Sequence, residues 1–180
     1  NWPERDFTKR IIFSIIGGVT EKKGVDFIIR SFMKLRNDNA RLLIVGRGEK
    51  DYESLCRRIA LQDKRIIFWG EERDILKIYS ISDYILRGEE YQCIGRTIYE
   101  GLYASCQVLI PAEVVNRKPM FEFDTFKQAI HFYQPRNEHE LSDLLKRLSL
   151  IKVRKLSFYS NVDVYVRQFH QFILGLINNA

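Results

Sequence analysis

Short apolar runs alternate with longer, mixed segments along most of the chain. These runs are rich in Ile, Leu, Val and aromatic residues, and Gly or Pro closes most of them. They lie at residues 10–16, 40–46, 65–70, 83–86, 107–111 and 129–135. Continuous apolar runs of this length are typical of strands that a parallel sheet buries on both faces.

The segments between the runs carry apolar residues at helical spacing, as Phe27, Ile28 and Phe32 illustrate. Asn137 has Glu140 three residues later, which is the pattern of a helix N-cap with a capping box. The spacing predicts helices at 25–36, 51–61, 72–82, 95–104, 137–151 and 157–177.

Strands that alternate with helices predict an α/β fold, a Rossmann-like open parallel sheet of about six strands with helices on both faces. Every notable loop follows a strand, so these loops should gather at one edge of the sheet. In such sheets ligands bind beyond the carboxyl ends of the strands, where the strand order reverses. The loops expected at that edge are 17–24, 46–50, 70–74 and 87–95.

The composition fits one globular domain, or one half of a two-domain enzyme, since 46% of the 180 residues are hydrophobic. No apolar run approaches the 18 or so residues of a membrane-spanning helix. The three cysteines form no CxxC pair and the three histidines are scattered. We therefore expect a reducing, cytoplasmic setting and no metal site.

The net charge of +6 is compatible with nucleic acid, an anionic membrane surface or a phosphorylated ligand. Basic residues are spread along the chain, and no basic segment is interleaved with aromatic residues as in RNA-binding modules. The charge thus favours a phosphorylated ligand, with no nucleic-acid partner.

Five segments in order resemble the C-terminal half of GT-B glycosyltransferases, specifically family 4 of the retaining sugar-nucleotide enzymes. The first contains Lys23-Gly24, and the fourth, QCIGRTIYEGLYASCQVLIP, resembles that family's most specific motif, two glutamates separated by seven residues. The matching segments are 15–32, 42–55, 65–86, 92–111 and 137–148. Residues 111–128 align with nothing in the family pattern.

The resemblance implies a single nucleotide-sugar-binding domain over residues 1–180. Within it, residues 1–9 would be the remnant of an interdomain linker and residues 157–180 a closing C-terminal helix. The N-terminal acceptor domain would be absent from this chain, and the isolated domain would be inactive alone.

The implied activity is transfer of a sugar from a UDP- or GDP-sugar to a glycan or lipid-linked acceptor, with retention and with neither metal nor other cofactor. By resemblance to bacterial relatives, the setting would be synthesis of surface polysaccharide such as lipopolysaccharide or capsule. The basic surface adds an expected peripheral contact with the anionic inner face of the bacterial cytoplasmic membrane.

Glu100 matches the second glutamate of the family motif, whose carboxylate accepts hydrogen bonds from the ribose hydroxyls. A glutamate that merely favours the helix dipole is the plainer interpretation. Gly95, Arg96 and Thr97 would present backbone N–H groups of a helix N-terminus to the diphosphate. The alternative for Gly95 is turn geometry alone, which we consider the weaker interpretation, and the alternative for Arg96 is exposure to solvent.

Lys23 would contact the β-phosphate, although Lys22 and Lys23 together could be a solvated pair. Gly17 and Gly18 lie in the family's glycine turn after the first strand, where the backbone approaches the donor. The family's arginine in that turn is Gly18 here, so one diphosphate cation is missing. Arg87 and Arg96 are candidates to replace it.

Gln92 takes the place of the first glutamate in the motif, because Gly95 fixes the register. Its amide can bind sugar hydroxyls but supplies no negative charge to an oxocarbenium-like centre; drift at a loop position is the alternative. Gln92 and Glu100 are the candidate catalytic residues. Trp69 follows the third strand, near the family's nucleobase site, where packing is the commoner role of a Trp.

Three other functions compete with the glycosyltransferase. A non-catalytic GT-B-like scaffold or regulatory module would explain Gln92 and Gly18 as marks of a decayed site. A non-hydrolysing sugar-nucleotide epimerase would need acid–base residues that the sequence does not offer. A nucleic-acid-binding α/β domain would need the aromatic residues that its basic segments lack.

Overall fold

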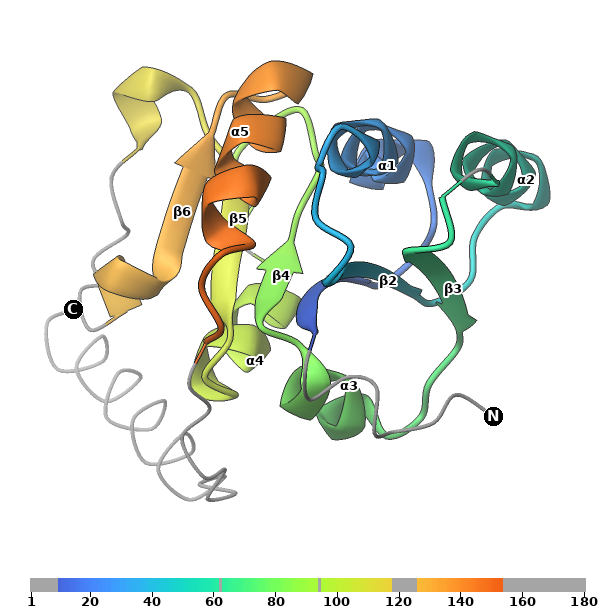
Figure 1. Ribbon diagram of the computed structural model, residues 1–180, viewed down its shortest axis with the longest axis horizontal. Helices are drawn as coiled ribbons and strands as arrows, with labels where there is room; N and C mark the ends of the chain where they lie inside the picture. Colours follow the sequence, from blue (N-terminus) through green and yellow to red (C-terminus); the bar gives the residue numbers. More distant parts are fainter. Residues whose placement is uncertain (1–9, 62, 94, 118–125, 154–180) are drawn as a thin grey trace, which may run out of the picture.

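The computed structural model describes residues 10–61, 63–93, 95–117 and 126–153, and they form one six-stranded sheet with helices on both faces (Figure 1). The strand order is β3-β2-β1-β4-β5-β6 and every neighbouring pair is parallel. The strands are β1 (Ile11–Ile16), β2 (Ala40–Val45), β3 (Ile66–Gly70), β4 (Tyr84–Leu86), β5 (Gln107–Pro111) and β6 (Ile130–Tyr133). The predicted fold class is confirmed.

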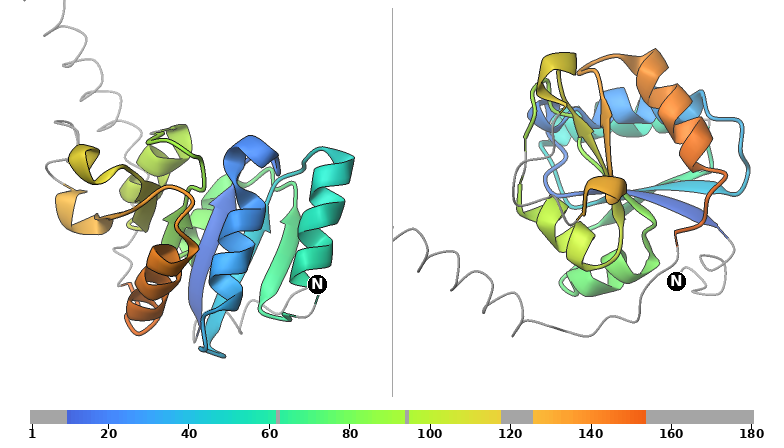
Figure 2. Two further views of the ribbon diagram at one scale, coloured as in Figure 1. Left: turned by 90° about the horizontal axis from the view of Figure 1, so that it is seen from above. Right: turned by 90° about the vertical axis from the view of Figure 1, so that its left-hand side faces the viewer.

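Among the described residues, three helices pack on one face of the sheet and two on the other, as Figures 1 and 2 show. The first group is α1 (Val25–Met33), α2 (Lys50–Ala60) and α5 (Glu138–Leu148), and the second is α3 (Ile75–Ile81) and α4 (Arg96–Tyr103). Short 3₁₀ turns at Glu21–Lys23 (η2) and Val114–Asn116 (η3) complete the described elements.

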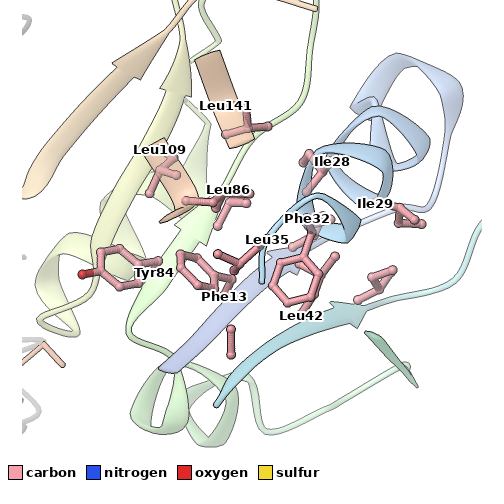
Figure 3. Close-up of a cluster of buried hydrophobic side chains, with 14 of the residues drawn as sticks. Phe13, Ile28, Ile29, Phe32, Leu35, Leu42, Tyr84, Leu86, Leu109 and Leu141 are labelled. Atoms are coloured by element: carbon pink, nitrogen blue, oxygen red, sulfur yellow. The ribbon is translucent and has the colours of Figure 1, made fainter. Parts of the chain in front are cut away.

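The two faces of the sheet are apolar because successive side chains of a strand point to opposite sides. On β1, Phe13 packs under α1 and stacks on Tyr84 of β4 with ring centroids 4.9 Å apart (Figure 3). Its neighbour Ile12 faces the cluster that includes Ile78 of α3. Burying one such side chain contributes about 1.5–3 kcal/mol, so these layers fix the helices to the sheet.

Two predicted helices differ in detail from the observed ones. The helix expected over 25–36 ends at Met33, and beyond its end the guanidinium of Arg65 binds the carbonyls of Leu35 and Asn37 (2.5 and 3.2 Å). Asn137 does cap α5, accepting the N–H of Glu140 at 3.0 Å. The carboxylate of Glu140 binds the N–H of Gln134 instead of closing a capping box.

The expected linker at 1–9 and closing helix at 157–180 lie outside the described residues, as does much of the unaligned segment 111–128. In the ranges that the structure describes, no helix combines the length and the apolar character that a membrane span requires.

Candidate functional site

The strand order reverses between β1 and β4, and the two loops that follow these strands meet at the carboxyl edge of the sheet. Gly24 adopts φ +59°, in the left-handed region. A Cβ on Gly24 would lie 1.9 Å from the carbonyl oxygen of Gly88, and a Cβ on Gly88 would lie 2.7 Å from that of Gly24. Glycine at both positions therefore lets the two backbones touch at the place where α/β sheets bind ligands.

A buried acid–base cluster lies at this contact. The Nζ of Lys23, at the end of η2, lies 3.0 Å from Oε1 of Glu89. Arg87 donates to the same carboxylate through two nitrogens, Nε to Oε2 at 3.1 Å and Nη2 to Oε1. The Glu89 side chain is 2% exposed and that of Lys23 38%. The three groups together carry one net positive charge, and the lysine is the most exposed of them.

Arg87 also ties this cluster to the start of α4. Its Nη1 donates to Oγ1 of Thr97 at 2.9 Å, and Nη2 lies 3.3 Å from Sγ of Cys93. Gly95 is the N-cap of α4, and a Cβ there would lie 3.1 Å from Arg87 Nη1. The guanidinium thus lies directly beneath the helix N-terminus, whose first N–H groups favour an anion.

Glu100 lies one turn into α4 and is held by two donors. Its Oε2 accepts the hydroxyl of Tyr79 at 2.6 Å, and its Oε1 lies 3.1 Å from Nε of the exposed Arg96. Burial and the neighbouring carboxylate raise the pKa of Tyr79 far above its usual value, so the phenol stays protonated and donates. The Glu100 side chain keeps 35% exposure, leaving an ionised acceptor open to a ligand.

The remaining predicted residues are divided between the crevice and the edge of the sheet. Gly17 (φ +127°) donates its N–H to the carbonyl of Val45, and Gly18 is exposed beside it. Gln92 is partly exposed in the loop that leads to α4. Trp69 lies on the edge strand β3, where it packs against the Ile78 cluster and donates to Oε2 of Glu72 at 3.2 Å.

Over most of its length, residues 2–161, the chain matches the model of the family described as glycosyl transferases group 1. The chain belongs to this family. It is 31% identical over 110 residues to an uncharacterized glycosyltransferase of Methanocaldococcus jannaschii, and 34% identical over 106 residues to a glycogen synthase of Paracidovorax citrulli. These alignments cover 59% and 57% of the chain but only 28% and 21% of the relatives.

Solved structures place the fold with GT-B glycosyltransferases. Anabaena HepE in complex with UDP and glucose aligns with a TM-score of 0.72 at 14% identity, over 99% of this chain and 53% of that one. The C-terminal domain of a group 1 family protein, LpcC of Francisella tularensis, gives a TM-score of 0.63 at 18% identity, over 80% and 78% of the two chains.

The structure brings together Lys23, Gly95, Thr97 and Arg87 at the carboxyl edge of the sheet. Of the two candidate replacements for the missing arginine, Arg87 is only 7% exposed and already engaged, so it is no free diphosphate cation, and the exposed Arg96 is paired with Glu100.

Sequence reasoning missed Tyr79 and the partnership of Glu89. Tyr79 stands 21 residues before Glu100 in a short helix that also carries Lys77 and Ser80, and nothing in the sequence pairs it with Glu100. For Glu89 the signal was available, since Arg87 and Glu89 stand two apart directly after a buried strand. Among the described residues, no group of three His, Cys, Asp or Glu side chains is arranged to hold a metal ion.

Proposed function

We propose that this chain is the nucleotide-sugar-binding, C-terminal domain of a retaining glycosyltransferase of family 4. It would bind a UDP- or GDP-sugar whose sugar passes to a glycan or lipid-linked acceptor held by a separate N-terminal domain. The observation that carries the proposal is the Gly24–Gly88 contact. It brings Lys23 and the N-terminus of α4, which carries Glu100, to one crevice at the switch point of the sheet.

The diphosphate would be held by Lys23 and by the backbone N–H groups of Gly95, Arg96 and Thr97. Charge that develops on the leaving group would be stabilised by these fixed donors, without a metal. In support, the family model covers most of the chain, and HepE, a structure of the same fold, is a complex with UDP.

Glu100 would bind the ribose. Its second donor, the exposed Arg96, forms a solvent-screened ion pair that a ligand can displace at little cost. Tyr79 would keep the carboxylate aimed while both ribose hydroxyls donate to it. Gln92 would hydrogen-bond the donor sugar, and Gly17 and Gly18 would let the first loop approach it.

The wider setting is part of the same proposal. We infer a role in bacterial surface polysaccharide synthesis, at the inner face of the cytoplasmic membrane, where a net charge of +6 suits an anionic surface. Because donor and acceptor would meet between two domains, the isolated domain would bind nucleotide weakly and transfer nothing.

Calorimetric titration with UDP, GDP and ADP tests the proposal. We expect saturable binding of one nucleotide, and Glu100→Ala should weaken it about tenfold, or about 1.4 kcal/mol. Glu138→Ala, on α5 across the sheet from α4, should leave the affinity unchanged. Absence of binding by the folded chain at about millimolar nucleotide would contradict the proposal.

A non-catalytic GT-B-like module is the second candidate, and one observation favours it. The ammonium group of Lys23 is already paired with the buried carboxylate of Glu89, so the crevice offers a diphosphate less free positive charge than the sequence suggested. Failure to bind any of the three nucleotides would select this candidate.

A further inference from the structure

We propose that Glu89 is a built-in competitor of the donor diphosphate, which holds the ammonium group of Lys23 until the donor takes it over. The inference rests on the proposed function and adds a way in which the chain sets its own donor affinity. Glu89 would then set the affinity for the donor through Lys23, without touching the donor itself.

The three members of the cluster differ in how firmly they are held. Arg87 is nearly buried and makes contacts to Glu89 through two nitrogens and to Thr97 through a third. Within the described part of the chain, the Nζ of Lys23 makes one polar contact, to Oε1 of Glu89, and the side chain is 38% exposed. A lysine is a point charge on a flexible stem, whereas a bidentate arginine is fixed in geometry. The Lys23–Glu89 contact is therefore the exchangeable one.

Exchange leaves no buried charge without a partner. When Lys23 turns to a phosphate, Glu89 keeps both of its contacts to Arg87, so the large cost of an unpaired buried carboxylate is avoided. The phosphate gains a charge-assisted contact at the moment that Glu89 loses one. Most of the attraction between Lys23 and the donor is thus offset, and Glu89 lowers donor affinity.

A purely structural Glu89 would act in the opposite direction. If its task were only to position Arg87, and through Thr97 the start of α4, then removing its charge would disorder the crevice and weaken binding. The two roles therefore predict opposite signs for the same substitution, which makes Glu89→Gln the decisive variant.

The test is a double-mutant cycle with UDP as the titrant, at low salt, on the wild type, Glu89→Gln, Lys23→Met and the double variant. We expect Glu89→Gln to bind UDP about tenfold more tightly. Lys23→Met should cost less than about threefold in the wild type but about tenfold in the Glu89→Gln background. Weaker binding by Glu89→Gln, or an equal cost of Lys23→Met in both backgrounds, would overturn the inference.

Thermal unfolding accompanies each titration, because Glu89→Gln removes the charge that pairs with buried Arg87. If that variant loses cooperative unfolding, the cycle is run on Arg87→Met/Glu89→Met, in which both buried charges leave together; the same background dependence of Lys23→Met is expected. Failure of the proposed function gives a different pattern: neither the wild type nor the charge-free background binds UDP, GDP or ADP. Wild-type binding that depends on Glu100, with the wrong sign for Glu89, refutes the inference alone.

Discussion

Strand β4 has a buried carboxylate at each end, and the two are used differently. Asp83, before the strand, accepts the N–H of Ile12 and the ammonium group of Lys152, both at 2.8 Å. Glu89, after the strand, binds side chains among the described residues, those of Arg87 and Lys23. The side chains are 1% and 2% exposed. Carboxylates of equal burial thus bind a backbone N–H at the amino end of the sheet and two side-chain cations at the carboxyl end.

The comparison teaches that burial alone does not separate structural from functional charge; the type of partner does. The N–H of Ile12 cannot turn to a ligand without opening the sheet, so its contact with Asp83 is structural. The side chain of Lys23 can turn away from Glu89, so this ammonium group can bind either Glu89 or a ligand. Substitutions at the amino end should change stability, and those at the carboxyl end should change affinity as well.

Gly24→Ala should have the largest effect, because it separates the two loops at the carboxyl end. The new Cβ would lie 1.9 Å from the carbonyl oxygen of Gly88, in a left-handed conformation that costs an L-residue about 1–2 kcal/mol before any clash. We expect a loss of about 3 kcal/mol or more in the free energy of unfolding, measured in urea, together with loss of UDP binding.

Gly18→Ala is the matched control, since its Cβ would meet nothing closer than 3.6 Å and its φ is not positive. Its stability should stay within about 0.5 kcal/mol of the wild type. A Gly24→Ala protein that unfolds within about 1 kcal/mol of the wild type would show that the loop contact is not needed.

Asp83→Ala tests the amino end and should cost about 2 kcal/mol, since the buried N–H of Ile12 loses its acceptor. The UDP affinity of the folded variant should change by less than about twofold. Urea denaturation and calorimetry check the two expectations, with exposed Asp143→Ala as the control for stability. Weakened UDP binding by Asp83→Ala would contradict the expectation that substitutions at the amino end change stability alone.

The sequence predicted the strands and helices of the sheet well because their positions follow from local patterns. The apolar runs gave all six strands, and Asn137 marked the start of α5 correctly. Lys23-Gly24 and Gly95 also fell at the predicted edge. A glycine marks a position where the backbone turns sharply or approaches another segment closely, and such positions can be recognised within a single segment.

The pairings within the site could not be predicted in this way. Lys23 meets Glu89 across 66 residues and Tyr79 meets Glu100 across 21, so each pair depends on how separate loops or helices pack. The family resemblance assigned Lys23 to a phosphate, and nothing in the sequence indicated that the carboxylate of Glu89 would lie beside it. Which side chains meet across such distances in sequence depends on how the elements pack, and this is seen only in the structure.

Tyr79→Phe should have a smaller effect on stability and on UDP affinity than the substitutions above. Loss of the hydrogen bond to Glu100 removes about 1 kcal/mol of stability and should weaken UDP binding about threefold, because the carboxylate is less firmly aimed. Tyr84→Phe is the matched control at the other end, where the hydroxyl donates to the carbonyls of Leu148 and Ile151.

Both tyrosine variants should lose comparable stability in urea, whereas only Tyr79→Phe should change the calorimetric affinity. Equal affinities for the two variants would mean that Tyr79 is a core residue with no part in aiming Glu100.

The smallest expected effect is a pH dependence of stability at the amino end, where His131 of β6 lies 2.5 Å from the amide oxygen of Gln107, the first residue of β5. Burial, and then the positive charge of Arg147, lower the pKa of His131 below its usual 6.5. The unfolded chain therefore binds a proton more readily than the folded one, and stability falls as the pH drops below about 6.5 towards the folded pKa.

Urea denaturation between about pH 7.5 and pH 5 should show this fall in the wild type and a shallower one in His131→Gln, which cannot titrate. Because carboxylates titrate in both proteins, the difference between the two curves isolates the histidine. Parallel curves would show that the titration of His131 does not contribute to the pH dependence of stability.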